Sequence, residues 1–247
     1  MKKIILECCV DSVQSAVNAR NGEADRLELC SALALGGLSP TVSLFSLVKK
    51  SCDLPINVLL RPREGDFLYS DYELAQLLDE VKTFKSLGAN GVVIGCLNTD
   101  GSLDMDNMRK LISAADGMDI TLHRAFDVSR DPLDTLKKAQ ELGVKTILTS
   151  GCAKNCTLGK ALIQTLCENS NGVEIMAGSG VNADVIADFA KTTDVRAFHM
   201  SGKQRVKSKM KYIAQNVSMG DEGVDEYSIW QTSEAEVKRA SNVLLFL

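Results

Sequence analysis

Charged and sulfur-bearing side chains recur at the ends of short apolar runs in this sequence. They comprise carboxylates, thiols, guanidinium groups and imidazoles, namely Glu7, Cys9, Glu28, Cys30, Arg61, Arg63, His123, Arg124 and His199. A carboxylate and an imidazole can exchange protons with a substrate, an arginine can bind a carboxylate or phosphate, and a thiolate can bind a soft metal ion. The residues can act together only if the fold brings the ends of the runs to one place.

The apolar runs are predicted to be the strands of one parallel sheet. They start 21 to 34 residues apart, which leaves room for one helix and two short loops between successive strands. Apolar residues between them recur at helical steps of three and four, most clearly over 71–88. Strands that are apolar on both faces are typical of a parallel sheet covered by helices. Eight runs predict a (β/α)8 barrel of the TIM type, and they are 4–9, 25–30, 56–61, 90–95, 119–124, 144–150, 172–178 and 195–200.

Length and composition predict one domain. The chain has 247 residues, with 28 Lys and Arg against 32 Asp and Glu. Because α/β barrels of this length form single domains, we expect residues 1–247 to form one, with a long loop over about 201–228 before a last helix. The acidic balance argues against a nucleic-acid partner, and the apolar runs are too short to span a membrane.

The chain contains 8 cysteines, and these indicate a reducing compartment. A chain of this size buries its own core without disulfides, and the first residues resemble a strand and not a signal peptide. We therefore expect free thiols and a cytoplasmic location. Most of the thiols are predicted to fill space in the core, where cysteine is common. No motif for an organic cofactor is evident.

The C-terminal ends of barrel strands normally carry the active site. Candidate catalytic residues are therefore Glu7, Glu28, Arg61, His123, Asp127 and His199. Either histidine could act as general acid or base, with a glutamate as its partner. The alternative is an internal network of glutamates and arginines that only closes the top of the barrel. The run 144–150 has no lysine near its end, which disfavours a Schiff-base aldolase.

Small loops at the same ends could bind an anion. Glycine lets backbone N–H groups approach a ligand at a helix N-terminus, and the last two strands of a barrel often hold a phosphate. The same residues are also typical of ordinary turns. The candidate ligand-binding residues are Arg63, Ser150, Gly151, Gly178, Gly180 and Ser201.

Five motifs are similar to those of the CutC family of copper homeostasis proteins. They are Glu7–Ser12, Arg26–Cys30, Arg61–Phe67, His123–Asp127 and Leu148–Gly151, and the resemblance extends over nearly the whole chain. It implies a TIM-type barrel, a cytosolic location, and a role in copper tolerance or trafficking through Cu(I) binding. It also implies a homo-oligomer such as a dimer, and copper-binding thiols at the positions of Cys9 and Cys30. Two positions depart from the family pattern: Ser179 stands between two glycines where the family has a third, and Leu122 replaces an aromatic residue.

The copper hypothesis has a physical basis in these two thiols. Cu(I) prefers thiolates and accepts few ligands. Cys9 and Cys30 end successive strands, which in a barrel are neighbours about 4.8 Å apart, so the two thiols could bracket one ion. A zinc site is less favoured because the chain has 2 histidines and no paired Cys-x2-Cys motif. Cys152 and Cys156 form a separate candidate pair.

Three classes of function therefore stay open at this stage. The first is Cu(I) binding in copper homeostasis. The second is a barrel enzyme that acts on a small anionic metabolite, bearing a phosphate or a carboxylate, by acid–base chemistry. The third is a ligand-binding protein that has kept the barrel without turnover. The partner is accordingly a copper ion or a small anionic ligand.

Overall fold

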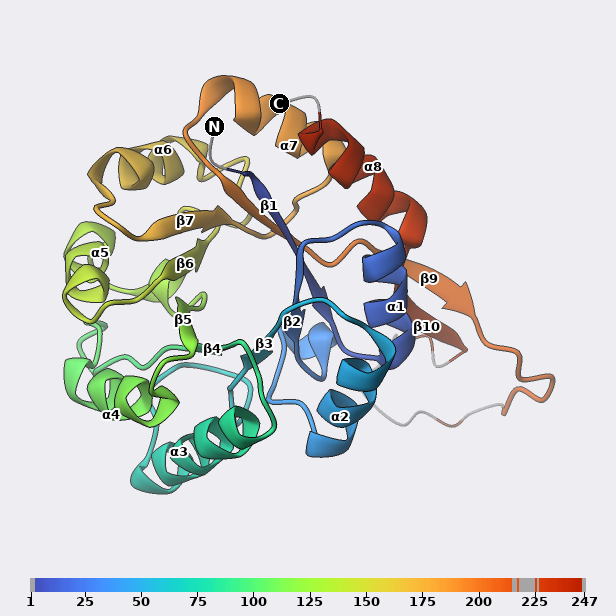
Figure 1. Ribbon diagram of the computed structural model, residues 1–247, viewed down its shortest axis with the longest axis horizontal. Helices are drawn as coiled ribbons and strands as arrows, with labels where there is room; N and C mark the ends of the chain where they lie inside the picture. The colour runs from blue at the N-terminus through green and yellow to red at the C-terminus, as the bar shows by residue number, and fades with distance from the viewer. Residues whose placement is uncertain (1–2, 215–216, 218–224, 226, 246–247) are drawn as a thin grey trace.

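Eight parallel strands form a closed barrel with the helices outside it (Figure 1). The computed structural model describes residues 3–214, 217, 225 and 227–245. The strands pair in chain order and β8 closes on β1, so the predicted fold class is confirmed. The strands are β1 Ile5–Val10, β2 Arg26–Leu29, β3 Ile56–Leu59, β4 Gly91–Ile94, β5 Asp119–Leu122, β6 Thr146–Thr149, β7 Glu174–Ala177 and β8 Ala197–Met200.

The helices begin where the sequence provides a capping side chain. Ser, Thr, Asp or Asn precedes every described α-helix except α6, and its side-chain oxygen accepts a hydrogen bond from a backbone N–H of the first turn. The α-helices are α1 Val13–Asn21, α2 Val42–Ser51, α3 Asp71–Ser86, α4 Met105–Ala115, α5 Pro132–Glu141, α6 Lys160–Asn169, α7 Ala183–Thr192 and α8 Glu234–Leu244. Two short 3-10 helices, η1 Leu33–Leu35 and η2 Phe126–Val128, follow β2 and β5.

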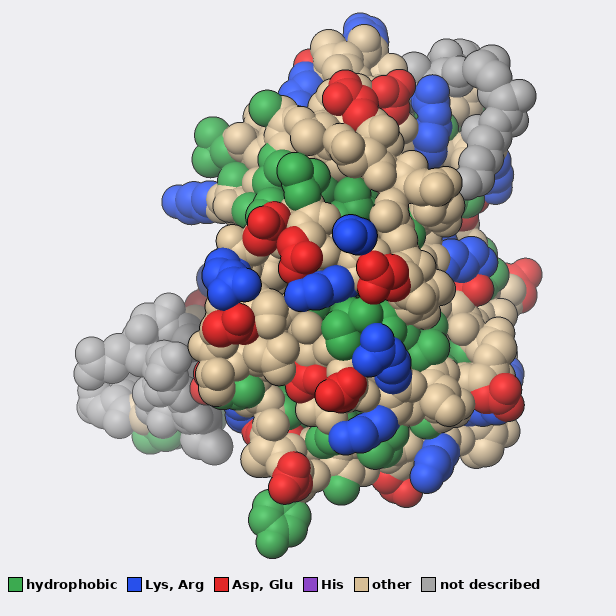
Figure 2. Space-filling model, turned by 90° about the vertical axis from the view of Figure 1, so that its left-hand side faces the viewer, with side chains coloured by type: hydrophobic (Ala, Val, Ile, Leu, Met, Phe, Trp, Pro, Cys, Tyr) green, Lys and Arg blue, Asp and Glu red, His purple; other side chains and the backbone are tan. Residues whose placement is uncertain are grey.

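Alternation along β1 separates the barrel interior from the helix layer. Leu6, Cys8 and Val10 belong to the large apolar core that β-strands and helices share. Glu7 and Cys9 therefore point into the barrel, since successive side chains of a strand face opposite ways. The helix exterior carries acidic and basic side chains interspersed, as Figure 2 shows for one face, which is usual for a solvated surface.

The predicted loop over 201–228 contains regular structure. Lys203–Lys207 form β9, which pairs antiparallel with β10, Ser228–Thr232, and this two-stranded arm projects beside α1 (Figure 1). All five residues of β9 are exposed, so this strand lacks the buried face by which a strand is usually predicted. Residues 215–216, 218–224 and 226 of the predicted loop lie outside the described residues. None of the described helices has the length and apolar character that a membrane crossing requires.

Candidate functional site

A cavity of about 400 Å³ opens at the C-terminal ends of the strands. Side chains from the ends of β1, β2, β3, β5 and β8 line it, together with the loop that follows β7. Of the residues predicted to act at this site, seven line the cavity, namely Cys9, Glu28, Arg61, His123, Gly180, His199 and Ser201. Glu7, Cys30, Arg63, Asp127, Ser150, Gly151 and Gly178 are not part of the lining.

Glu7 is fully buried and holds the ring of His199. Its Oε1 lies 2.8 Å from Nδ1 of His199, while Oε2 accepts hydrogen bonds from Nε of Arg26 at 2.5 Å and from Asn57 at 3.3 Å. Burial disfavours the charged carboxylate, but His199 and Arg26 outweigh burial and lower the pKa of Glu7 to about 2. A carboxylate can only accept, so Nδ1 of His199 carries the hydrogen and Nε2 is left for other chemistry.

Cys9, Glu28 and His199 meet at the cavity wall. The thiol sulfur, a carboxylate oxygen and a ring nitrogen all lie within 4.8 Å of one another. Nε2 of His199 is 3.8 Å from Oε2 of Glu28. Burial opposes an imidazolium here, but Cys9, Glu28 and Glu7 together hold the pKa of His199 well above 6.5. Burial is also the main cause that raises the pKa of Glu28 to about 7.

Cys30 lies two residues beyond the residue of β2 that stands opposite Cys9. In the β1–β2 register Cys9 stands opposite Glu28, and Cys30 follows two residues later, roughly 6.6 Å further along the strand direction. Cys30 is fully buried, and its thiol donates to the carbonyl of Val10 at 3.5 Å. The cluster that contains Cys9 is completed by a carboxylate and an imidazole, and Cys30 is not part of it. A copper site shared by Cys9 and Cys30 stays a prediction.

Arg61 is buried without a carboxylate partner among the described ion pairs. Its Nη1 donates to the carbonyls of Leu35 and Gly37, at 3.1 and 3.2 Å, and its Nη2 donates to that of Gly65 at 2.9 Å. The guanidinium carbon lies 5.1 Å from the centre of the Phe67 ring. Nε of Arg61 is buried and has no hydrogen-bond partner.

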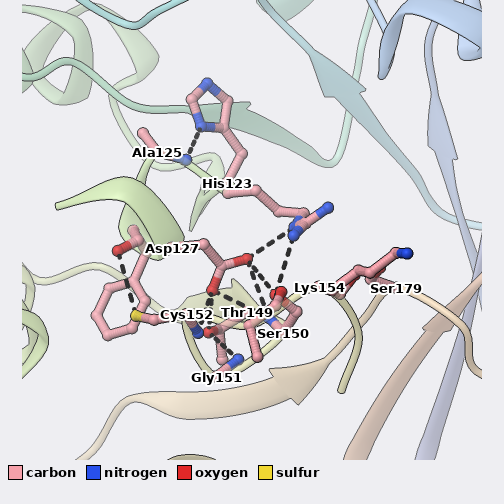
Figure 3. A network of polar contacts seen from close by, with 12 residues as sticks. His123, Ala125, Asp127, Thr149, Ser150, Gly151, Cys152, Lys154 and Ser179 are labelled. Carbon is pink, nitrogen blue, oxygen red and sulfur yellow. Dashed lines mark hydrogen bonds and ion pairs between the residues drawn. The ribbon is translucent and has the colours of Figure 1, made fainter. Parts of the chain in front are cut away.

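His123 is buried on the same part of the wall. Its Nδ1 accepts the backbone N–H of Ala125 at 3.1 Å (Figure 3), and its ring centre lies 4.7 Å from that of Phe67. Burial, with the charge of Arg61, lowers the pKa of His123 to about 3. The ring is therefore neutral at pH 7 and carries its hydrogen on Nε2, which is buried without a partner.

Asp127 is the centre of a closed network in the loops after β5 and β6 (Figure 3). Its carboxylate accepts from Oγ1 of Thr149 at 2.5 Å, from the backbone N–H of Ser150 and Cys152 at 3.0 and 3.1 Å, and from Nε of Arg124 at 2.7 Å. The donors that suggested an anion-binding loop therefore serve a carboxylate of the protein itself.

Three other predicted ligand-binding residues, Arg63, Gly151 and Gly178, lie outside the cavity lining and contact other parts of the protein. Arg63 pairs with Glu73 at 2.5 Å and with Asp66 at 3.0 Å. Gly151 has a φ of +70°, and a Cβ there would lie 2.2 Å from the Gly159 carbonyl oxygen, so it permits a close backbone approach. A Cβ on Gly178 would lie 2.5 Å from Leu148. All three make close contacts within the protein, and their predicted part in ligand binding stays a prediction.

Phe67, Arg26 and Asn57 contribute to the site but were not predicted from the sequence. Phe67 belongs to the Arg61–Phe67 motif, but nothing in the motif showed that its ring lies between the Arg61 and His123 side chains. The contact of β1 with β8 follows from barrel closure, and it could have indicated that His199 meets Glu7 and Cys9.

Comparisons with known proteins agree with the fold and the motifs. The sequence profile that defines the CutC family matches residues 4–204. The chain belongs to the CutC family. A CutC family protein from Histophilus somni is 40% identical over 233 residues, covering 94% of this chain and 96% of that one. Another from Vibrio vulnificus is 42% identical over 236 residues, covering 94% of each.

A solved CutC structure shares the fold. The CutC protein from Streptococcus agalactiae, whose name gives it a proposed role in copper homeostasis, superposes with a TM-score of 0.76. It is 27% identical to this chain and covers 80% of it, and 98% of that protein is matched. The family resemblance that the motifs suggested is therefore confirmed.

Proposed function

We propose that this member of the CutC family is a copper homeostasis protein that binds Cu(I) at the cavity, through Sγ of Cys9 and Nε2 of His199. The observation that carries the proposal is the convergence of Cys9, Glu28 and His199 within 4.8 Å of one another. The name of the Streptococcus agalactiae relative points to the same role.

The donor set fits the chemistry of Cu(I). A soft ion prefers a thiolate and accepts an imidazole, whereas a carboxylate suits harder ions, so Glu28 is a secondary contact. Glu7 hydrogen-bonds the opposite nitrogen of His199, which is the usual way in which a second carboxylate orients a metal-ligating histidine. Copper binding would displace the proton from Nε2 of His199, so affinity should increase with pH.

The pair Cys9 and Cys30 is the competing ligand set. Cys30 could reach the ion only if its thiol left the carbonyl of Val10. The two sets share Cys9 and differ in the second ligand, because the first requires His199 and the second requires Cys30. Cys8 provides a matched control, since it is adjacent to Cys9 but packs in the helix layer.

Anaerobic titration with Cu(I) against a competing chelator tests the proposal. We expect Cys9→Ser and His199→Gln to lose the high-affinity site, and Cys30→Ser and Cys8→Ser to keep it. Loss in Cys30→Ser equal to that in Cys9→Ser would favour the two-thiol set. Unchanged affinity in Cys9→Ser would overturn copper binding at this cavity and point to Cys152 and Cys156.

A second candidate function is acid–base catalysis on a small anion. Its support is Glu28, a buried carboxyl group that faces the cavity and has a pKa of about 7, which is the range for a general acid or base at neutral pH. Incubation with pools of phosphorylated sugars and carboxylic acids in D2O tests it. An enzyme of this kind would exchange a substrate C–H for deuterium, and Glu28→Gln would abolish the exchange.

Location and assembly belong to the same proposal. All eight cysteines are free, which is what a reducing compartment such as the cytoplasm maintains. The homo-oligomer that the family resemblance implies stays a prediction, and sedimentation equilibrium of the purified protein would test it.

A further inference from the structure

Two buried donors lie on a part of the cavity wall that copper binding does not use. Cys9, Glu28 and His199 come from β1, β2 and β8, whereas Arg61 and His123 follow β3 and β5. Arg61 is 9% exposed and His123 is 4% exposed, yet each has a polar nitrogen without a partner. Buried donors are nearly always satisfied in folded proteins, so two unsatisfied donors from residues that line the same cavity require an explanation.

Arg61 brings a positive charge that forms no ion pair with any of the described carboxylates. The described contacts use both N–H groups of Nη1 and one of Nη2, all on backbone carbonyls. They leave Nε–H and one N–H of Nη2. These carbonyls orient the guanidinium group but carry no net charge, and a buried charge without a counterion is costly. The free N–H groups of an arginine can together hold two oxygens of one oxyanion.

His123 adds a neutral donor. Since its Nδ1 accepts from Ala125, its hydrogen is on Nε2. The ring is fixed from the other side as well, because a Cβ on Gly95 would lie 2.7 Å from it. The ring of Phe67 packs against both His123 and Arg61.

We infer that this part of the cavity binds the oxyanion group of a small molecule, a phosphate or a carboxylate, between Arg61 and His123. Phe67 lies in the cavity lining and its ring packs against both side chains, so this binding mode requires the ring to move away from Nε of Arg61 and Nε2 of His123. Lys203, which also lines the cavity, adds a second positive charge. The site is independent of copper, because it shares no ligand with Cys9, Glu28 or His199.

Calorimetric titration of the metal-free protein, with a chelator present, tests this inference. The probes are inorganic phosphate and succinate, which distinguish a phosphate-bearing from a carboxylate-bearing ligand. We expect saturable binding of at least one, and a loss of about tenfold or more in affinity for Arg61→Gln. Arg63→Gln is the matched control and should bind as the wild type does. Equal affinity in Arg61→Gln, or no saturable binding of either probe, would overturn the inference.

A second variant covers the case in which Arg61→Gln does not fold, since Arg61 also holds three backbone carbonyls. His123→Phe keeps an aromatic ring against Phe67 but removes the Nε2 donor, and it should weaken the same ligand. Nitrogen-15 NMR gives a direct measurement, because the Nε2–H resonance of His123 should shift on titration with the probe that binds. A resonance that does not move would contradict the inference. Cys9→Ser should retain oxyanion affinity, which separates this site from copper binding.

Discussion

The polar groups around Asp127 and those around Arg61 lie on the same barrel, but they differ in completeness. Asp127 accepts hydrogen bonds from several donors and pairs with Arg124, so its network is closed. Arg61 and His123 each keep a buried nitrogen without a partner. A network in which every buried group has a partner stabilises the fold. Buried donors without a partner cost free energy that the rest of the fold must offset, and they indicate a ligand. Sequence motifs alone do not distinguish the two.

Asp127→Ala should have the largest effect on stability. The substitution leaves Thr149, Ser150 and Cys152 with donors that have no acceptor, and it removes the partner of Arg124. Each buried donor left unsatisfied is costly, so we expect a loss of about 3 kcal/mol or more in the free energy of unfolding. A urea titration measures it. A loss as small as that of a surface variant would show that water replaces the carboxylate easily, and the contrast with Arg61 would fail.

Acid should remove the contribution that the ionised Glu7 makes to the free energy of unfolding. Its pKa is about 2 in the folded protein and near 4.5 when unfolded, so its contribution is present above about pH 4.5 and is lost as pH falls from there toward 2. The shift corresponds to roughly 3 kcal/mol. Urea titrations at several pH values should show this loss in the wild type. Glu7→Gln should lack this part of the pH dependence, and an unchanged profile in the variant would contradict the assignment.

His123 should also make the protein less stable in acid, but at higher pH than Glu7 does. Its folded pKa is about 3, below the unfolded value near 6.5, so the unfolded state takes up a proton first as pH falls. Stability is fully present above about pH 6.5, and roughly 2 kcal/mol is lost by pH 5. His123→Phe should flatten the profile between pH 6.5 and 5. A profile that is equally steep in the variant would contradict this assignment.

Arg63→Gln should have a smaller effect on stability than the substitutions of Asp127, Glu7 and His123. Its guanidinium group is paired with Glu73 and Asp66 at the protein surface, and such pairs contribute little to stability. We expect a melting temperature close to that of the wild type and unchanged oxyanion binding. A marked loss of binding would move the oxyanion site from Arg61 to Arg63.

The sequence predicted the barrel and the strand ends because both depend on local pattern. Spacing and apolar runs located β1 to β8. The sequence could not predict that Cys9 of β1 stands opposite Glu28 of β2. The register between the two strands depends on the stagger of the closed barrel. Ser150 and Gly151 resembled an anion-binding loop for a related reason, since only the fold shows that Asp127 reaches them.

The arm of β9 and β10 also provides an optical probe. Trp230, the one tryptophan of the sequence, lies in β10. The ammonium of Lys203 lies 4.9 Å from the centre of its indole ring, and Lys203 also lines the cavity. A cation held near an indole shifts and quenches its emission, so ligand binding that draws Lys203 toward the cavity will change the fluorescence of the unlabelled protein. Arg205 lies 4.9 Å from the same ring, so a change in emission on titration would report the movement of Lys203 if Arg205→Gln shows the same change.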